Sequence, residues 1–161
     1  MEHLRIGSNS FDEVFEAVSS AVGAYLTHRK NTDPTRKGGY CTIVERLTEE
    51  VVTTFEVGKP AHAKAEWYRG LSVEKALRLL ETNAQHGHVT SGQSRNETND
   101  KYAGAIIVED YIFSFSGFAP DLADEATMIK AVHILGWISE SEAEELGKVN
   151  KNEWVGLLLA A

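Results

Sequence analysis

Two histidines around one glycine form the densest group of side chains that could bind a metal ion or a haem. His86 and His88 flank Gly87. In an extended segment, residues two apart face the same side, so both imidazoles could bind one metal ion or flank a haem edge. A metal site would need a third ligand, such as His62 or Glu66. The alternative is a helix that ends at Gly87, with two solvated histidines near its C-terminus.

An aromatic pair followed by an arginine is the second candidate. Trp67, Tyr68 and Arg69 are residue types that are common at interfaces. Trp67 and Tyr68 are therefore expected to line a ligand pocket or a subunit contact, and with His86 and His88 they make up the predicted cofactor-binding set. The alternative is a pair of ordinary core aromatics beside a surface arginine.

Three acidic residues could form a carboxylate set for acid–base chemistry or for a cation. They are Asp121, Asp124 and Glu125, and a predicted helix begins where they stand. Negative charge is favourable near a helix N-terminus, so helix electrostatics explain these residues without a function. We favour that interpretation.

The remaining reactive side chains have structural explanations. Cys41, the single cysteine, excludes an intramolecular disulfide and is expected to be a small buried hydrophobic residue, since no base stands near it in the sequence. His28 is expected at a helix end, and His133 beside an apolar helix stripe with one hydrogen bond. No residue is predicted to be catalytic, and a resident metal ion is not expected.

The first third of the chain predicts a helix and then a hairpin. Ser10 and Glu13 match a capping box, and the apolar spacing that follows predicts a helix over 11–27. Alternating β-branched and aromatic residues then predict two strands, 40–47 and 51–57. Two sets are each expected on one strand face: Cys41, Ile43 and Leu47; and Val51, Thr53, Phe55 and Val57.

The middle of the chain predicts one helix and one polar loop. Ser72 is expected to cap a helix that runs to Ala84 with Gly87 as its end, and the segment 61–70 before it is ambiguous. Its predicted apolar stripe is Val73, Ala76, Leu77, Leu80 and Ala84. The segment 88–101 is the most polar stretch of the chain, and we interpret it as a mobile loop.

The last part predicts a second hairpin and two helices. Residues 102–108 are apolar on both faces, which favours a central strand, and 111–116 pair with them. Gly104 within the strand indicates the close approach of another group. A helix is expected from Pro120 to Gly136, with the stripe Leu122, Ala126, Ile129, Val132 and Leu135. A second capping box at 139–142 predicts a short helix to Leu146, and 154–159 are expected to pack as a tail.

This order predicts an α/β (α+β) fold. A single antiparallel sheet of four to five strands with helices packed on it, in a profilin-like layout, accommodates two hairpins separated by a helix. The length of 161 residues fits a single domain over 1–161, with a core at about 11–136 and a C-terminal short helix and tail at 139–161.

Composition argues against two classes of partner. The formal net charge is −8 and there is no dense Lys/Arg cluster, so neither nucleic acid nor an anionic membrane surface is an expected partner. The stretch 1–10 lacks the apolar segment of a signal peptide, and the apolar run at 155–161 is too short to span a bilayer. A cytoplasmic protein is expected.

One stretch resembles a known family. It runs from Tyr102-Ala103-Gly104-Ala105-Ile106-Ile107-Val108 through Ser114-Phe115-Ser116-Gly117 to Asp124-Glu125-Ala126. It is similar to the Gly-Ala-Ile strand, Ser-Gly turn and Asp-Glu helix start of the GlcG/HbpS-like family, which shares its fold with the haem-binding C-terminal domain of PduO-type proteins. The outline covers about 11–136. The chain departs from the family at the first hairpin turn, at 91–100, and between Ser116 and Asp124.

The resemblance implies a small-molecule or haem-binding protein, often a homo-oligomer, and it implies no catalytic residue. We therefore expect a ligand-binding protein of this kind, with haem as the possible cofactor. The first alternative is a non-catalytic interaction or dimerisation module. The second is a small enzyme that uses the polar segment 91–100 as a lid, although no nucleophile–base pair is legible in the sequence.

Overall fold

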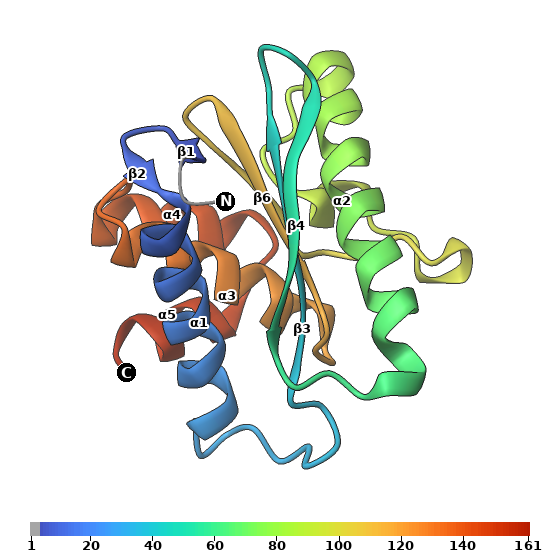
Figure 1. The fold of residues 1–161 in the computed structure, drawn as a ribbon, viewed down its shortest axis with the longest axis vertical. Coiled ribbons are helices and arrows are strands. Elements are labelled where there is room, and N and C mark those ends of the chain that lie inside the picture. The colour runs from blue at the N-terminus through green and yellow to red at the C-terminus, as the bar shows by residue number, and fades with distance from the viewer. Residues whose placement is uncertain (1–3) are drawn as a thin grey trace.

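A computed structural model describes residues 4–161 of the chain (Figure 1). Met1–His3, part of the stretch expected to lack a signal peptide, lie outside the described residues. The elements are, in order, β1 (Arg5–Ile6), β2 (Asn9–Ser10), α1 (Phe11–Thr27), β3 (Gly38–Glu45), β4 (Glu50–Gly58), α2 (Ala65–His86), β5 (Ala105–Val108), β6 (Tyr111–Ser116), α3 (Asp121–Ile134), α4 (Glu140–Val149) and α5 (Glu153–Leu159). Three 3-10 turns lie between them at His62–Lys64, Ser91–Ser94 and Glu97–Asn99.

The predicted fold class is confirmed. Four antiparallel strands form one sheet in the order β4-β3-β6-β5, and β1 and β2 form a separate small ribbon. Helix α2 covers one face of the sheet, while α1 and α3 cover the other, with α4 and α5 packed outside α3 (Figure 1). The chain is therefore a helix–sheet–helix sandwich.

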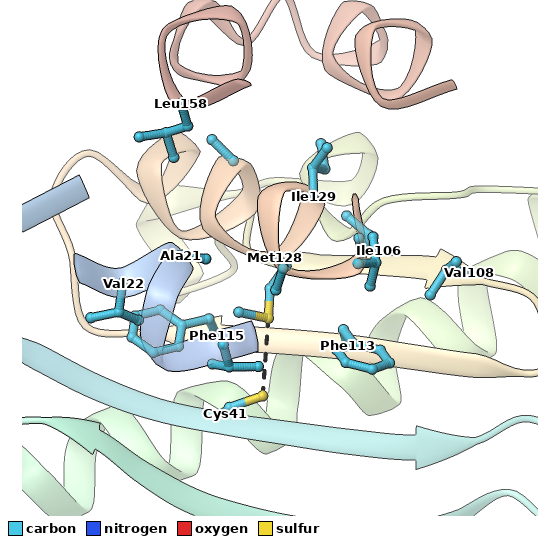
Figure 2. Close-up of a cluster of buried hydrophobic side chains, with 14 of the residues drawn as sticks. Ala21, Val22, Cys41, Ile106, Val108, Phe113, Phe115, Met128, Ile129 and Leu158 are labelled. Carbon is cyan, nitrogen blue, oxygen red and sulfur yellow. Dashed lines mark hydrogen bonds between the residues drawn. The ribbon is translucent and has the colours of Figure 1, made fainter. Parts of the chain in front are cut away.

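The larger core lies between the sheet and α3. Alternate residues of β3 and β6, such as Cys41, Phe113 and Phe115, point toward Met128 of α3 (Figure 2). The Cys41 Sγ lies 4.0 Å from the Met128 Sδ, and the cysteine is fully buried. Burial raises the pKa of the Cys41 thiol, so it is the inert hydrophobic residue that the sequence predicted.

The strand expected to be central lies at the sheet edge. β5 contains only Ala105–Val108 and pairs with β6 alone. Its outer edge is covered by the preceding segment, because the Ile107 N–H donates to the Val89 carbonyl and Thr90 bridges Ile106. With helices on both faces and this segment on its edge, an edge strand acquires the apolar composition of a central one, which explains the wrong prediction.

Two further predictions were wrong in detail. Strand β3 ends at Glu45 and the register shifts between Ile43 and Val44, so Leu47 lies in the turn at 81% exposure and Val51 is also exposed. Helix α2 begins at Ala65, earlier than predicted, because the ambiguous segment is helical. Its buried residues are Tyr68, Ser72, Lys75, Ala76 and Leu79, so Ala76 alone of the predicted stripe is fully buried.

The end signals of the other helices are confirmed. Both capping boxes form, with Glu13 at the start of α1 and Glu142 at the start of α4. Gly87 and Gly136 have φ values of 70° and 77°, the left-handed conformation that lets each glycine end its helix. Helix α4 runs to Val149, beyond the predicted end, and the tail forms α5. No helix in the described part of the chain is long and apolar enough to cross a membrane.

Candidate functional site

A cavity of about 350 Å³ opens where three elements meet. It lies at the first turns of α2, the end of β6 and the start of α3, and the segment before β5 closes one side. The lining is aromatic and charged: Arg36, Lys64, Trp67, Tyr68, Leu71, Lys75, Arg95, Glu97, Tyr102, Ser116, Phe118, Ala119, Pro120, Asp121 and Asp124.

A buried ion pair lies at the wall of this cavity. The Lys75 Nζ donates to the Asp124 Oδ2 at 3.0 Å and to the Phe115 carbonyl at 2.8 Å, and the two charged side chains are 1% and 2% exposed. Strand β5 begins at Ala105, opposite Ser114, and just before it the Phe115 N–H still donates to the Gly104 carbonyl at 2.9 Å, whereas the Phe115 carbonyl accepts from Lys75. Lys75 thus joins α2, β6 and α3 at this end of β5.

Gly104 makes room for this arrangement. Its φ is 141°, and a Cβ placed there would lie 2.5 Å from the Phe115 carbonyl oxygen and 2.6 Å from the Lys75 Nζ. The close approach that the sequence indicated at Gly104 is therefore confirmed, and the approaching groups are a backbone carbonyl and the buried ammonium.

Burial raises the pKa of Asp124 to about 6. Loss of water around the carboxylate outweighs the stabilising effect of Lys75 and of the Phe118 N–H, which donates to the Asp124 Oδ1 at 2.8 Å. The group is therefore ionised at neutral pH and takes up a proton in mildly acidic solution.

The other two acids of the predicted carboxylate set are also buried, and helix electrostatics alone do not account for them. The Asp121 carboxylate accepts from the Ala103 N–H at 2.7 Å and pairs with Arg95. Glu125 points away from the cavity, accepts from the amides of Asn150 and Asn152, and has its pKa raised by burial. The three acids therefore do not form one carboxylate site.

The polar segment interpreted as a mobile loop is held by one arginine of α2. The Arg78 guanidinium donates to the carbonyls of Ser91, Ser94 and Tyr102, and its side chain is 8% exposed. These bonds fix the segment against α2 and bring Arg95 to the cavity rim. Arginine can do this because its planar group presents five donors in a rigid fork.

Trp67 and Tyr68 form an aromatic wall of the cavity. Tyr68 is 7% exposed and its ring faces the Arg36 guanidinium, whose carbon lies 5.6 Å from the ring centroid. Trp67 is 48% exposed, a high value for so large an apolar side chain. The structure therefore places both predicted aromatic residues at the cavity.

The predicted histidine pair lies far from these aromatics. Trp67 and His86 are nineteen positions apart along α2, which corresponds to about 28 Å at the usual helical rise. The rings of His86 and His88 lie 5.4 Å apart at the other end of the helix, with His86 exposed. The four residues of the predicted set therefore cannot hold one ligand, and within residues 4–161 no group of three metal-binding side chains is present.

His28 and His133 have the structural surroundings that the sequence suggested. The His133 Nδ1 lies 3.1 Å from the Ile138 carbonyl, in one hydrogen bond beside the core. The His28 ring packs on Trp154 with centroids 5.6 Å apart, directly after the end of α1.

Sequence reasoning missed Lys75, Arg78 and Arg95. The sequence did contain a signal for Lys75, which lies three residues after Ser72 and four before Leu79, on the buried face of α2. A lysine at such a position needs a buried partner. Only the folded chain shows that this partner is Asp124, on the opposite side of the sheet.

Comparison of the chain with models of known protein families, with curated proteins and with solved structures finds no match. The resemblance to the GlcG/HbpS-like family stays a prediction that rests on the motif between Tyr102 and Ala126.

Proposed function

We propose that the protein binds a small organic ligand in the cavity at the start of α2. The observation that carries the proposal is the exposed Trp67 and the nearly buried Tyr68 standing over a cavity whose wall holds the buried Lys75–Asp124 pair. Ligand sites are typically concave, lined by aromatic groups and given specificity by a few placed polar groups. The cavity volume lies within the usual range of about 300–1,000 Å³.

The cavity is also largely pre-formed. Lys75 and Arg78 tie its walls to α2 by hydrogen bonds to backbone carbonyls, and Asp121 holds the Ala103 N–H on the opposite side. A site whose walls are fixed before binding loses less conformational entropy when the ligand arrives. This supports binding of a small molecule over docking of a flexible segment.

Haem is a second candidate ligand because the family resemblance implies it. The part of the lining that the structure describes contains no His, Cys or Met. Axial ligation in the cavity would therefore fall to a tyrosine, either Tyr68 or Tyr102, as in the tyrosinate-ligated haem proteins. His86 and His88 would have to bind haem elsewhere, at the far end of α2.

The test is a titration of the protein with a panel of small aromatic acids, amines, neutral compounds and haemin. Tryptophan fluorescence and the thermal midpoint are recorded together. We expect a saturable one-to-one change for at least one compound. The Trp67→Ala variant should weaken that binding up to about tenfold, since an aromatic contact contributes about 0.5–1.5 kcal/mol beyond its buried area.

Leu77→Ala is the matched control, because Leu77 is a similarly exposed apolar residue of α2 that does not line the cavity. Binding that survives Trp67→Ala unchanged would place the site elsewhere. For haemin, a Soret shift lost in Tyr68→Phe would locate haem in the cavity, whereas one lost in His88→Ala would locate it at the histidine pair. Failure of the whole panel would refute ligand binding and favour the interaction module.

A further inference from the structure

Several hydrogen-bond donors of the cavity have no partner within the part of the protein that the structure describes. Ser116, which lines the cavity and is 3% exposed, has a side-chain hydroxyl without a hydrogen bond to any described residue. The Lys75 ammonium has three N–H groups, and two of them are used by Phe115 and Asp124. The Tyr68 hydroxyl also has no partner among residues 4–161. Each of these three groups can donate to a ligand.

The two buried carboxylates of the cavity already have a donor on each oxygen. One oxygen of Asp124 accepts from Lys75 and the other from the Phe118 N–H. The two oxygens of Asp121 accept from Arg95 and from the Ala103 N–H. Each of these carboxylates is also paired with a cation of the protein, Asp124 with Lys75 and Asp121 with Arg95, so their negative charge attracts a cationic ligand less.

The rim adds positive charge over the aromatic wall. Arg36 and Lys64 line the cavity, and the closest described acid to Arg36 is Asp33, with 4.0 Å between the charged atoms. Arg95 is neutralised by Asp121 and by Glu97 at 2.8 Å. Unused donors inside the cavity and cations at its rim therefore both favour a negatively charged ligand.

From this arrangement, which rests on the proposed ligand-binding function, we infer that the ligand is a planar organic oxyanion. Its carboxylate or phosphate oxygens accept from the Ser116 hydroxyl and from the remaining N–H of Lys75. Its flat apolar part packs against the wall formed by Trp67 and Tyr68. Arg36 and Lys64 attract the anion from solution and make its binding dependent on salt.

Four compounds of nearly the same shape but different charge test whether the ligand must be negatively charged. Calorimetric titrations use 2-naphthoate, the neutral 2-naphthamide, the cationic 2-naphthamidine and 2-naphthyl phosphate. We expect the two oxyanions to bind at least about tenfold more tightly than the amide, as charge-assisted hydrogen bonds of about 1.5–3 kcal/mol imply. The amidine should bind most weakly. The ratio of the two oxyanion affinities identifies which headgroup the site prefers.

Ser116→Ala tests the assigned hydrogen bond. Its matched control is Ser114→Ala on the same strand and the same sheet face, since Ser114 is also buried with an unpartnered hydroxyl but does not line the cavity. We expect Ser116→Ala to weaken oxyanion binding about tenfold, and to weaken binding of the amide, whose carbonyl is a neutral acceptor, several-fold less. Ser114→Ala should leave both affinities unchanged. Neither variant loses a protein hydrogen bond, so both are expected to fold.

A second pair of variants tests the rim. Lys64→Gln should reduce oxyanion affinity and flatten its salt dependence, whereas Lys59→Gln, an exposed lysine outside the lining, should do neither. Equal affinities for naphthoate and naphthamide, or tighter binding of the amidine, would overturn the oxyanion inference. If those compounds still bind in a Trp67-dependent way, the proposed ligand site stands. If no compound of either panel binds, both fail.

Discussion

Replacement of Lys75 by methionine is expected to destabilise the protein strongly at neutral pH and much less in mild acid. Methionine has a similar length and is apolar, so the change removes the ammonium and leaves the shape of α2 nearly intact. It leaves the Asp124 carboxylate buried with the Phe118 N–H as its remaining described donor, and it leaves the Phe115 carbonyl without its partner.

The magnitude follows from the burial of the pair. Removal of one partner of a buried ion pair typically costs about 3–5 kcal/mol. For a domain of this size, about 2–4 °C in thermal midpoint corresponds to 1 kcal/mol, so the midpoint should fall by roughly 6–20 °C at pH 7.5.

The pH dependence comes from Asp124. Burial raises its pKa from 3.8 to about 6 in the folded protein, so at pH 5 this carboxyl is mostly protonated before any mutation is made. The ion pair is then already lost, and Lys75→Met removes only hydrogen bonds, at a cost of about 1–3 kcal/mol. For the same reason the free energy of unfolding of the wild-type protein should fall as the pH rises from about 4 to about 6. In that range the folded state holds the proton on Asp124 more tightly than the unfolded state does.

The assay is urea unfolding followed by circular dichroism at pH 7.5 and pH 5.0. Lys101→Met is the control, since Lys101 is 43% exposed and its ammonium lies 3.9 Å from Glu74. Its cost should stay below about 1 kcal/mol at both pH values. A cost for Lys75→Met that is the same at both pH values, or below about 1 kcal/mol at pH 7.5, would refute the assigned role of the pair.

Three further predictions concern single residues. Gly104→Ala should lower the free energy of unfolding by more than about 1 kcal/mol, because a Cβ there meets the backbone and Lys75. Gly23→Ala in α1, where no atom lies within 4 Å of a Cβ, should raise it by about 0.5–1 kcal/mol. Urea unfolding of both variants checks this, and equal effects would contradict it. Arg78→Met should release the segment 88–101 and speed its hydrogen exchange or protease cleavage, with α1 unaffected as the internal reference. Cys41 should not react with a thiol reagent in the folded protein and should react fully in urea, since the thiol is buried and its pKa is raised; rapid native labelling would contradict this.

Local sequence signals predicted the elements well wherever the signal acts within a few residues. A capping box needs only a hydroxyl and a carboxylate three positions apart, so the starts of α1 and α4 were predictable from Ser10 and Ser139. Gly87 and Gly136 ended helices for an equally local reason. The alternating apolar pattern was enough to predict both hairpins and the single antiparallel sheet.

The same signals failed where a residue's surroundings come from distant segments. The position of β5 at the sheet edge depends on coverage by Val89 and Thr90, and the buried face of α2 depends on which sheet residues it meets. A polar composition suggested a loose segment at 88–101, but Arg78 satisfies its carbonyls from another element. Contacts between segments that are distant in the chain cannot be read from a single sequence.

The candidate site shows the same division. The sequence by itself predicted that Trp67 and Tyr68 line a pocket or a contact, and it indicated a close approach at Gly104. Only the tertiary structure decided that these aromatics stand over Lys75 and Asp124, forty-nine positions apart in the chain, and that His86 lies at the far end of the same helix. The physical reason is that a buried charge requires a partner, and the sheet and the helices on its two faces decide which partner is within reach.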